Sequence, residues 1–531
     1  MTTTTSKNKY GQYWTPELIA NFMIGLADIQ QDSKILEPSS GTGVFLNLLQ
    51  QKKFNKISAY EIDEELAKKY EYIKNESFIS ANIQDKYNLV IGNPPYIRWK
   101  NLECELKSEL ANNYLWKKYF NSLCDYSYLF ILKSIELLAE GGQLIFITPE
   151  YWLNTMHSIS LRNYMVEHGY FSEIYHFNET PIFNKATVST IVFKYVKNPN
   201  VKNKKINIVK YYANKKLTNK IINNIKNKIS DEKTDVFKIS QFQQNKRWLL
   251  ADEKKIKEFK LFEDKCIHRT RNTGQQALFP LVECDTHYCK ISEICEIGNG
   301  MVSGLDKAFQ LNGEHLNANE KNSRLQVIKA KDLKPFTYKN TTKYIFANEV
   351  ESDVILEKDY PNYWQKLQDF KPKLNKRYQY NKKINYWQWV FMRNFNLFNT
   401  KTPRIFVPSK ERISNKDYFR FSYVEQNIFP TQDVTAIFKK DNIEESLYYI
   451  LALLNNHRTF NWLKYNGVVK GNIVEFSEKP IASIPFRKID WQDKKEIQIH
   501  NIITGLCKNY IEHGSEPILK KINTEIDKLF Q

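Results

Sequence analysis

Residues 87–100 read YNLVIGNPPYIRWK, and the rest of the chain is organised around this stretch. The apolar run from Asn88 to Ile91 predicts a short buried strand, and the two prolines that follow end it. Pro95 favours an extended backbone at Pro94, so we expect a stiff loop to leave the strand. Ligands bind at the carboxyl ends of strands in open α/β sheets, and this loop lies at such an end. The stretch therefore predicts a core strand followed by a binding loop.

The loop contains Asn93, Pro94 and Tyr96, which together suit a planar group with an exocyclic amine. The Asn93 carboxamide oxygen and the Pro94 carbonyl can each accept one N–H, while the Tyr96 ring packs on the face of the planar group. The alternative is that the loop is only a tight turn after a core strand, because short motifs recur by chance. Features elsewhere in the chain decide between the two.

A second candidate site precedes this stretch. Lys34 to Leu36 predicts a strand, Glu37 to Gly43 (EPSSGTG) a glycine-rich turn, and VFLNLLQQ the helix after it. This order is that of nucleotide sites, but it lacks the G-x-G-x-x-G pattern of dinucleotide sites and a Walker lysine. Ile57 to Tyr60 predicts the next strand, which ends at Glu61, 20 positions after Gly41. An acid at about that spacing bonds ribose hydroxyls, so the pattern suits a nucleoside ligand such as S-adenosylmethionine.

Two further side chains are candidates for the same ligand. Thr15 precedes the expected helix PELIANFMIGLA, where it is either an ordinary N-cap or a group that holds a carboxylate together with the helix N–H groups. Asn82 ends a predicted third strand, Ser77 to Asn82, where it is either a turn residue or a reader of the adenine edge. Each candidate thus has a plain structural alternative.

Strands and helices go on alternating after the NPPY loop. The predicted elements are helix, strand, helix and strand, at Asp125 to Ala139, Gln143 to Thr148, Arg162 to His168 and Ser172 to Phe177. The segment from Thr180 to Tyr195 then has a polar loop followed by a β-branched strand. This alternation predicts an α/β fold, a doubly wound and mainly parallel sheet with helices on both faces. Phe183 lies in the polar loop before the last strand, as either a stacking residue for an extruded base or an aromatic plug of the core.

The composition indicates a folded, basic protein of several domains. At 531 residues the chain is too long for one core and suggests roughly two to four domains. Its 78 Lys and Arg against 59 Asp and Glu point to a polyanion such as nucleic acid, although abundant Lys and Asn are also typical of AT-rich genomes. No apolar run could span a bilayer, and MTTTTSKNKY lacks the apolar core of a signal peptide. We therefore expect a cytoplasmic protein without a membrane partner.

The seven cysteines indicate neither a disulfide framework nor a metal site. Their spacing forms no paired pattern, which fits a reducing cytoplasm. Cys266 with His268, and Cys284 with His287 and Cys289, resemble a zinc set only loosely, because their spacing matches no structural zinc pattern. We predict no metal.

The second half of the chain differs from the first in composition. Lys197 to Lys228 is strongly basic, as either a solvated linker or a phosphate-contacting flank. Between Tyr338 and Val407 aromatic and basic side chains interleave, which suits a nucleic-acid surface but is also ordinary for a mixed α/β domain. Ser446 to Leu463 predicts a helix, Gly467 to Phe476 a hairpin, and the chain from Trp491 onward a helix pair. We expect domains at residues 1–236, 237–490 and 491–531.

Six blocks in a fixed order, TPEL, EPSSGTG, AYEID, SAN, NPPY and TPIFNKATVS, resemble the gamma class of DNA adenine-N6 methyltransferases, the TaqI-like group. This resemblance covers Tyr10 to Tyr195. The second half, with NGMVSGLDKAF, TPRIFVP and the stretch from Leu451 to Phe486, is similar to the TaqI-type specificity domain. The resemblance implies a Rossmann-like, seven-stranded methyltransferase sheet followed by a mixed α/β DNA-recognition domain.

The resemblance also implies roles for individual residues. The expected contacts of S-adenosylmethionine are Thr15, Glu37, Gly41, Gly43, Glu61 and Asn82. Those of the target adenine are Asn93, Pro94 and Tyr96, with Phe183 stacked on its other face. Asn82 departs from the family, which often has Asp at that place.

The implied activity is methyl transfer from S-adenosylmethionine to N6 of a flipped-out adenine within a specific sequence of double-stranded DNA. We expect the modification enzyme of a restriction–modification system, a monomer in the bacterial cytoplasm that joins the nucleoid when on DNA, beside a restriction endonuclease for the same site. Two alternatives stay open: the same chemistry on RNA or a protein glutamine, and a DNA-recognition subunit of a restriction nuclease complex.

Overall fold

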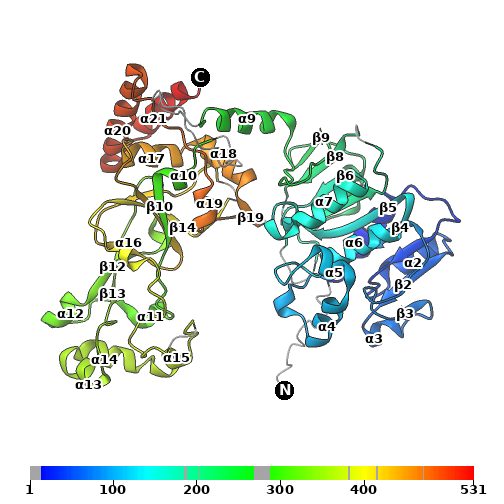
Figure 1. The fold of residues 1–531 in the computed structure, drawn as a ribbon, viewed down its shortest axis with the longest axis horizontal. Helices are drawn as coiled ribbons and strands as arrows, with labels where there is room; N and C mark the ends of the chain where they lie inside the picture. Colours follow the sequence, from blue (N-terminus) through cyan, green and yellow to red (C-terminus); the bar gives the residue numbers. More distant parts are fainter. Residues whose placement is uncertain are drawn as a thin grey trace, which may run out of the picture. The chain divides into compact units, whose positions relative to one another are not determined.

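The computed structural model describes residues 13–183, 188–201, 204–213, 215–267, 288–380, 383–413, 416–470 and 472–531. The chain forms two compact units (Figure 1): Met1–Lys255 with Lys470–Asn472, and Ile256–Val469 with Ile473–Gln531. The first unit extends beyond the expected end at residue 236, because Trp248 and Leu250 belong to its core. Residues 491–531 belong to the second unit and do not form a third.

The first unit alternates strands with helices. Its elements are α1 (Glu17–Ile24), β1 (Ile35–Glu37), α2 (Val44–Gln51), β2 (Ile57–Glu61), α3 (Glu64–Ala67), β3 (Ile73–Asn75), β4 (Tyr87–Gly92), η1 (Trp99–Asn101), α4 (Cys104–Asn112), α5 (Tyr114–Tyr119), α6 (Ser127–Leu137), β5 (Leu138–Pro149), η2 (Glu150–Leu153), η3 (Met156–Ser158), α7 (Ile159–His168), β6 (Tyr170–His176), β7 (Thr190–Val196), β8 (Ile206–Tyr211), α8 (Asn219–Lys226) and β9 (Thr234–Ile239). Helix α9 (Glu253–Asp264) crosses into the second unit.

The strands of the first unit form one sheet in the order β3-β2-β1-β4-β5-β7-β6-β8-β9. Strand β7 is antiparallel to β5 and β6, and β9 is antiparallel to β8, while the other neighbours are parallel. The predicted α/β class is confirmed. The described part of the sheet has nine strands instead of the expected seven, because β8 and β9 lie in and just after the basic stretch that the sequence suggested as a linker.

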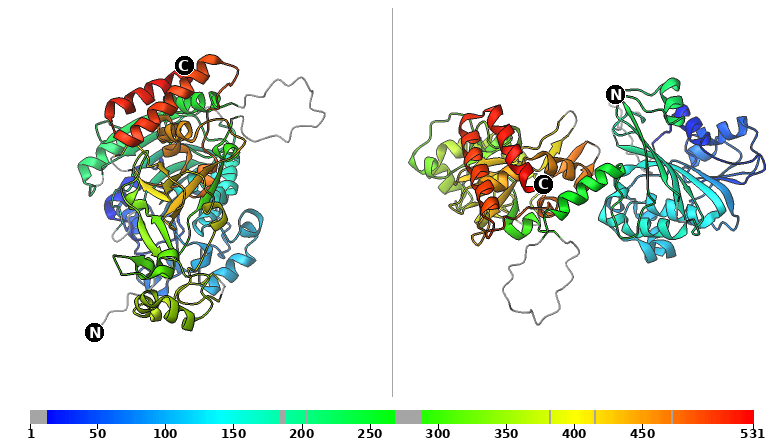
Figure 2. Two further views of the ribbon diagram at one scale, coloured as in Figure 1. Left: turned by 90° about the vertical axis from the view of Figure 1, so that its left-hand side faces the viewer. Right: turned by 90° about the horizontal axis from the view of Figure 1, so that it is seen from above.

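Helices cover both faces of this sheet (Figures 1 and 2). Leu36 of β1 and Val90 of β4 pack in one cluster with α6 and α7, whereas the preceding residues, Ile35 and Leu89, pack in another with α1, α2 and α8. Side chains of a strand point alternately to opposite faces, so a strand covered on both faces must be apolar along its length. This is why YNLVIG is an almost continuous apolar run.

Two segments of the first unit differ from the predicted elements. Residues 77–82 form no strand, because β3 ends at Asn75 and the chain from 76 to 86 consists of turns and loop. Gly141 and Gly142, which lie between the helix predicted to end at Ala139 and the strand predicted to begin at Gln143, are inside β5. A Cβ atom on Gly142 would lie 2.8 Å from the Tyr87 carbonyl oxygen, so glycine here permits a close approach of two strands.

The second unit is a mixed α/β structure of short elements. They are α10 (Ile291–Ile294), β10 (Cys295–Asn299), α11 (Asp306–Phe309), β11 (Gln310–Leu311), α12 (Ala318–Asn322), β12 (Arg324–Ile328), η4 (Ala330–Asp332), β13 (Thr342–Ile345), α13 (Asp353–Asp359), α14 (Pro361–Gln368), α15 (Lys371–Asn375), α16 (Phe395–Phe398), β14 (Arg404–Pro408), β15 (Lys410–Arg412), β16 (Ser422–Val424), β17 (Ile428–Pro430), β18 (Val434–Lys439), α17 (Leu447–Leu454), α18 (His457–Asn466), β19 (Val468–Lys470), β20 (Ile473–Glu475), α19 (Glu478–Ala482), α20 (Lys494–His513) and α21 (Glu516–Leu529). Its sheets have the orders β10-β18-β14-β16, β11-β13-β12-β17 and β15-β20-β19.

Several predictions for the second unit are confirmed. Strands β19 and β20 are neighbours in one sheet, as the predicted hairpin requires, and α20 and α21 are the predicted terminal helix pair. The single helix predicted from Ser446 to Leu463 is instead two, α17 and α18. The break lies at Asn456, whose side chain accepts a hydrogen bond from the Arg458 N–H at 3.0 Å and so caps the start of α18.

The described residues contain neither a membrane-spanning helix nor a metal-binding cluster. None of the helices in the described ranges is long and apolar enough to cross a membrane. Within the same ranges, no group of three or more His, Cys, Asp and Glu side chains is placed to hold a metal ion. His268, Cys284 and His287 of the loosely zinc-like set lie outside the described residues.

Candidate active site

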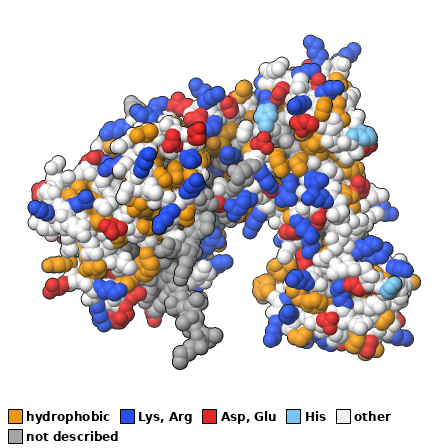
Figure 3. Space-filling model, turned by 180° about the vertical axis from the view of Figure 1, so that it is seen from behind, with side chains coloured by type: hydrophobic (Ala, Val, Ile, Leu, Met, Phe, Trp, Pro, Cys, Tyr) orange, Lys and Arg blue, Asp and Glu red, His pale blue; other side chains and the backbone are white. Residues whose placement is uncertain are grey.

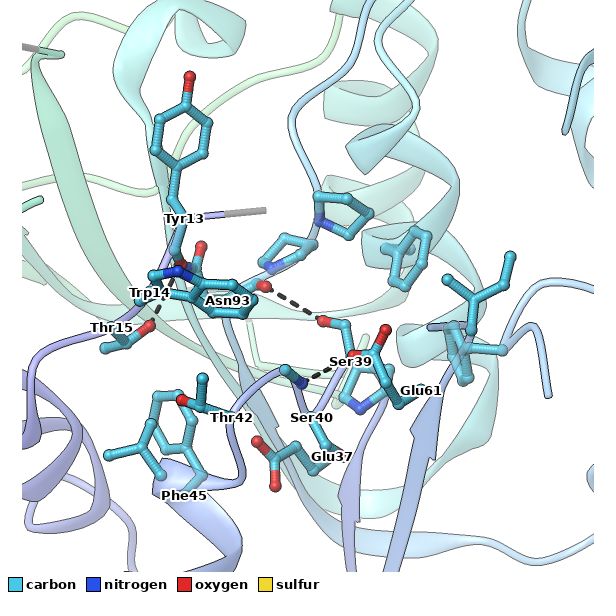
Figure 4. Close-up of a pocket in the computed structure, with 18 of the residues that line it drawn as sticks. Tyr13, Trp14, Thr15, Glu37, Ser39, Ser40, Thr42, Phe45, Glu61 and Asn93 are labelled. Atoms are coloured by element: carbon cyan, nitrogen blue, oxygen red, sulfur yellow. Dashed lines mark hydrogen bonds between the residues drawn. The ribbon is translucent and has the colours of Figure 1, made fainter. Parts of the chain in front are cut away.

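A hollow opens at the carboxyl ends of β1, β2 and β4, where the sequence predicts a ligand site. It contains about 750 Å³ of empty space, part of it open to solvent. Figure 4 shows the side chains of Tyr13, Trp14, Thr15, Glu37, Ser39, Ser40, Thr42, Phe45, Glu61 and Asn93 around it. The glycine turn, the NPPY loop and the segment before α1 therefore meet at one place, although they are far apart in the sequence.

The Asn93 side chain is held in one orientation. Its Nδ2 group donates to the Tyr13 carbonyl oxygen at 2.7 Å and to Thr15 Oγ1 at 3.1 Å (Figure 4), and its backbone carbonyl accepts from Ser39 Oγ at 3.0 Å. Because both N–H groups of the carboxamide are used in this way, Oδ1 is the atom left to accept a hydrogen bond. The amide is thus fixed as an acceptor at the end of β4.

Tyr96 lies beside this acceptor. Its hydroxyl is within hydrogen-bond reach of two oxygens, Asn93 Oδ1 and the Ile147 carbonyl. Burial, and after it the charge of Asp125, raise the pKa of Tyr96 well above its ordinary value, so the phenol keeps its proton. In this structure the Tyr96 hydroxyl therefore stands where a ligand N–H could bind Asn93.

The Tyr13 ring contacts the rings of both predicted stacking residues, Tyr96 and Phe183. The Tyr13 ring centroid is 5.8 Å from that of Tyr96 and 5.7 Å from that of Phe183. Phe183 is buried, with 7% of its surface exposed. The structure thus brings Phe183 into the neighbourhood of the NPPY loop, with Tyr13 in contact with both predicted stacking residues.

The glycine turn is tied to β2 through Glu61. Glu61 Oε2 accepts from the Gly41 N–H at 2.7 Å, and Oε1 accepts from the Asp63 N–H at 2.9 Å. Gly43 has a φ of +75°, and a Cβ atom there would lie 2.6 Å from the Tyr70 ring, so a larger residue would strain this turn. Glu61 and Gly41 are therefore brought together as their spacing predicts, and Gly43 supports the turn without lining the hollow.

Glu37 lies on the wall of the hollow with 0% of its surface exposed. Both of its carboxyl oxygens are buried without a hydrogen-bond partner among the described residues. Burial, and after it the nearby Glu61, raise its pKa well above the ordinary value, and burial also raises the pKa of Glu61. Two carboxyl groups so placed suit a ligand that carries N–H donors or positive charge.

Thr15 and Asn82 differ from their expected places. The N-cap of α1 is Pro16, which makes no side-chain cap, and Thr15 instead lines the hollow and accepts from Asn93. Asn82 is exposed, accepts from Gln84 Nε2 at 2.6 Å and lies in a separate hollow bounded by Lys133. The expected end-of-strand position of Asn82 is thus corrected, and its predicted contact with a cofactor gains no support from this placement.

Sequence reasoning missed several residues of the hollow, among them Ser77, Phe78, Tyr13 and Ser39. Ser77 and Phe78 follow β3 and line the hollow, which Asn82 does not, while Tyr13 and Ser39 hold Asn93. Ser77 and Phe78 follow the polar end of IKNE, a signal that the third strand ends before them. No local pattern marks Tyr13, because it acts through its backbone carbonyl.

Comparison with known proteins identifies relatives along nearly the whole chain. The chain is 42% identical over 524 residues to the type II methyltransferase M.HindII of Haemophilus influenzae, and the match covers 98% of each chain. It is 40% identical over 523 residues to M.HincII of the same species, again over 98% of both. The chain belongs to the type II DNA methyltransferases.

Two further similarities fit this type II DNA methyltransferase. Residues 27–183, which include the glycine turn and the NPPY loop, match the family described as Eco57I restriction-modification methylase. The solved structure of the type IIL restriction-modification enzyme MmeI in complex with DNA has the same fold, with a TM-score of 0.56 over 97% of this chain and 72% of that one. At 12% identity this likeness concerns the fold alone.

Proposed function

We propose that this type II DNA methyltransferase is of the gamma, TaqI-like class and methylates the N6 amino group of adenine in a specific DNA sequence. The observation that carries the proposal is the orientation of the Asn93 carboxamide. Its N–H groups are used by the Tyr13 carbonyl and Thr15 Oγ1, so it offers its oxygen to a ligand. An acceptor at this position favours a target that donates N–H, such as an amine or an amide.

The adenine amine needs orientation because it is a poor nucleophile. Its nitrogen lone pair is delocalised into the ring until the nitrogen becomes pyramidal. The Asn93 side-chain oxygen and the Pro94 carbonyl would each accept one of its N–H groups and aim the lone pair at the methyl group. Such groups act through orientation and transition-state electrostatics, without a covalent enzyme intermediate.

We propose S-adenosylmethionine as the methyl donor, which supplies an activated methyl group on a positively charged sulfur. The hollow fits this ligand because Glu37 is a buried acceptor that lacks a partner, next to a second acidic side chain, Glu61. Glu61 would accept from ribose hydroxyls, at the spacing from the glycine turn that such an acid has. Ile62 and Phe78, which also line the hollow, give apolar surface for the adenine ring of the donor. Thr15 and Gly41 would complete the contacts.

A target base has to enter between Tyr96 and Phe183, where the Tyr13 ring now contacts both. We therefore propose that the Tyr13 ring moves aside when the base enters. The hydrogen bond from the Tyr96 hydroxyl to Asn93 Oδ1 would break, and an N–H group of the base would donate to Oδ1 instead. Base flipping costs a few kcal/mol, and stacking between aromatic rings would offset that cost. Before DNA binds, the Tyr96 hydroxyl pairs with Asn93 Oδ1, so this acceptor is not left without a partner in the free protein.

We propose that the second unit recognises the DNA sequence. The chain has a net charge of +19, and Lys and Arg side chains are spread over the face shown in Figure 3, among acidic and apolar ones. Such charge favours phosphate contacts, which position a duplex without selecting its sequence. A monomeric state and a partner endonuclease for the same site stay predictions.

The proposal is tested by supplying S-adenosylmethionine with a labelled methyl group together with plasmid DNA, RNA and a protein mixture. We expect label in DNA only, and nucleoside analysis should give N6-methyladenine. Asn93→Ala should abolish most of the transfer, while Asn223→Ala, an exposed asparagine on α8, should not change it. Label in RNA or protein, or on cytosine, would contradict the proposed acceptor.

A further inference from the structure

The segment from Ser77 to Ala81 borders the hollow through its first two residues and does not belong to the sheet. Ser77 and Phe78 line the hollow, and residues 76–86 pair with no strand. The segment is a single turn in which the Ala81 N–H donates to the Ser77 carbonyl at 2.9 Å. Its other carbonyl groups therefore need donors from elsewhere in the protein.

One side chain supplies most of these donors. Lys133 of α6 donates from Nζ to the carbonyl oxygens of Phe78, Ile79 and Ala81, at 2.6, 2.9 and 2.8 Å. Its Nζ also lies 5.0 Å from the centroid of the Phe78 ring. An ammonium group has three N–H donors, and here each has its own carbonyl, so the segment is held at three points by one charge.

The charges around Lys133 come from three elements. Burial lowers the pKa of Lys133 to about 8, while the carboxylates of Glu109 on α4, Glu76 before the turn and Glu136 on α6 act in the opposite direction. Glu109 also accepts from Ser77 Oγ at 2.5 Å, so it holds the same segment from the other side. Lys133 and Glu109, which do not line the hollow themselves, thus hold the turn that contains Ser77 and Phe78.

We infer that Lys133 is a positioning residue for the methyl donor, and that the protonated side chain is needed to hold Ser77 and Phe78 where the donor binds. The inference rests on the proposed use of this hollow by S-adenosylmethionine. When Lys133 loses its proton, the amine has two donors for three carbonyls, so the turn loses one of its three hydrogen bonds from Lys133. Of the three carbonyls, that of Ile79 also accepts from Asn113 Nδ2, at 3.4 Å. We then expect the turn to hold Phe78 less firmly at the place where the methyl donor would bind.

The test is the affinity of the full-length protein for S-adenosylhomocysteine, measured by calorimetry between pH 7 and pH 9. If the protonated form binds, affinity is present below the pKa and is lost above it, so Kd should rise about tenfold over this range. Lys133→Arg keeps a charge throughout and should show a much smaller rise. Lys133→Met should bind about tenfold more weakly at pH 7 and show no further loss towards pH 9.

Lys117→Met, which removes an exposed lysine of α5, is the matched control and should behave like the natural chain. Thermal unfolding of each variant shows whether it is folded, and the natural chain alone still tests the inference through its own pH profile. Equal pH profiles for the natural chain and Lys133→Met would overturn the inference about Lys133. Failure of the natural chain to bind S-adenosylhomocysteine at pH 7 would instead overturn the proposed cofactor.

Discussion

Two walls of the same hollow are built in different ways. The wall at Asn93–Pro95 continues β4. Strand β4 lies between β1 and β5 and pairs with both, so the position of this wall follows from the sheet. The wall at Ser77 and Phe78 begins the turn Ser77–Ala81, which has no strand partner and is held by the side chains of Lys133 and Glu109. The position of the first wall should therefore change little with pH or with single substitutions around it. The position of the second wall should change with both.

The largest effect on activity should come from the wall that contains Asn93. Asn93→Ala removes the acceptor of the target amine, and we expect single-turnover methyl transfer to DNA to slow about 100-fold or more. Affinity for S-adenosylhomocysteine should change little, because Asn93 mainly serves the target base. Near-normal transfer by a folded Asn93→Ala protein would contradict the role given to this wall.

Glu61→Ala should have the next largest effect, this time on the methyl donor. The substitution removes the acceptor of the Gly41 N–H and the proposed acceptor of ribose hydroxyls. Hydrogen bonds to charged groups contribute about 1.5–3 kcal/mol, so we expect Kd for S-adenosylhomocysteine to rise about 10- to 100-fold. Calorimetry at pH 7 measures this, and an unchanged Kd would remove Glu61 from the site.

The independence of the two walls can be measured with a double variant. We expect Lys133→Met to raise Kd for S-adenosylhomocysteine about tenfold and to leave transfer at saturating donor nearly unchanged. Both substitutions, Lys133→Met and Asn93→Ala, should slow single-turnover transfer when the donor concentration lies below its Kd. In that assay the two free-energy changes should add within about 0.5 kcal/mol, because they act on different ligands. A strong departure from additivity in a double-mutant cycle would show that the walls move together.

Glu37→Gln should act in opposite directions on stability and on binding. The pKa of Glu37 is raised in the folded protein, so the folded state binds this proton more tightly than the unfolded state. The charge therefore costs stability once the pH passes the unfolded value, and its removal should raise Tm at pH 7, by about 2–4 °C for each kcal/mol gained. Donor affinity should fall. A lower Tm in calorimetric scans would contradict this account of Glu37.

The smallest effect should come from Asn82→Ala. Asn82 is exposed and lies outside the hollow, so we expect Kd for S-adenosylhomocysteine to stay within about twofold of the natural value. Ser77→Ala, by comparison, should raise Kd several-fold, because it breaks the hydrogen bond between Ser77 and Glu109. A larger effect of Asn82→Ala than of Ser77→Ala would support the original prediction that Asn82 contacts the methyl donor.

The same contrast explains what the sequence could predict. The NPPY loop, the glycine turn and the Gly41–Glu61 pair follow local rules of strand, turn and spacing, and the structure brings them together. The run SFISAN looks like a strand by composition, but its carbonyls are satisfied by Lys133, which lies more than fifty residues away. A contact of that kind leaves no local pattern. Strands β8 and β9 were missed for a related reason, since their surroundings are rich in Lys and Asn.

The most direct test of the central claim is the identity of the methylated atom. Plasmid DNA treated with the purified protein and S-adenosylmethionine should be digested to nucleosides and analysed by mass spectrometry. We expect N6-methyladenine with the natural chain and almost none with Asn93→Ala. Methylated cytosine, or unmodified DNA despite binding of the donor, would contradict the claim that Asn93 orients an adenine amine.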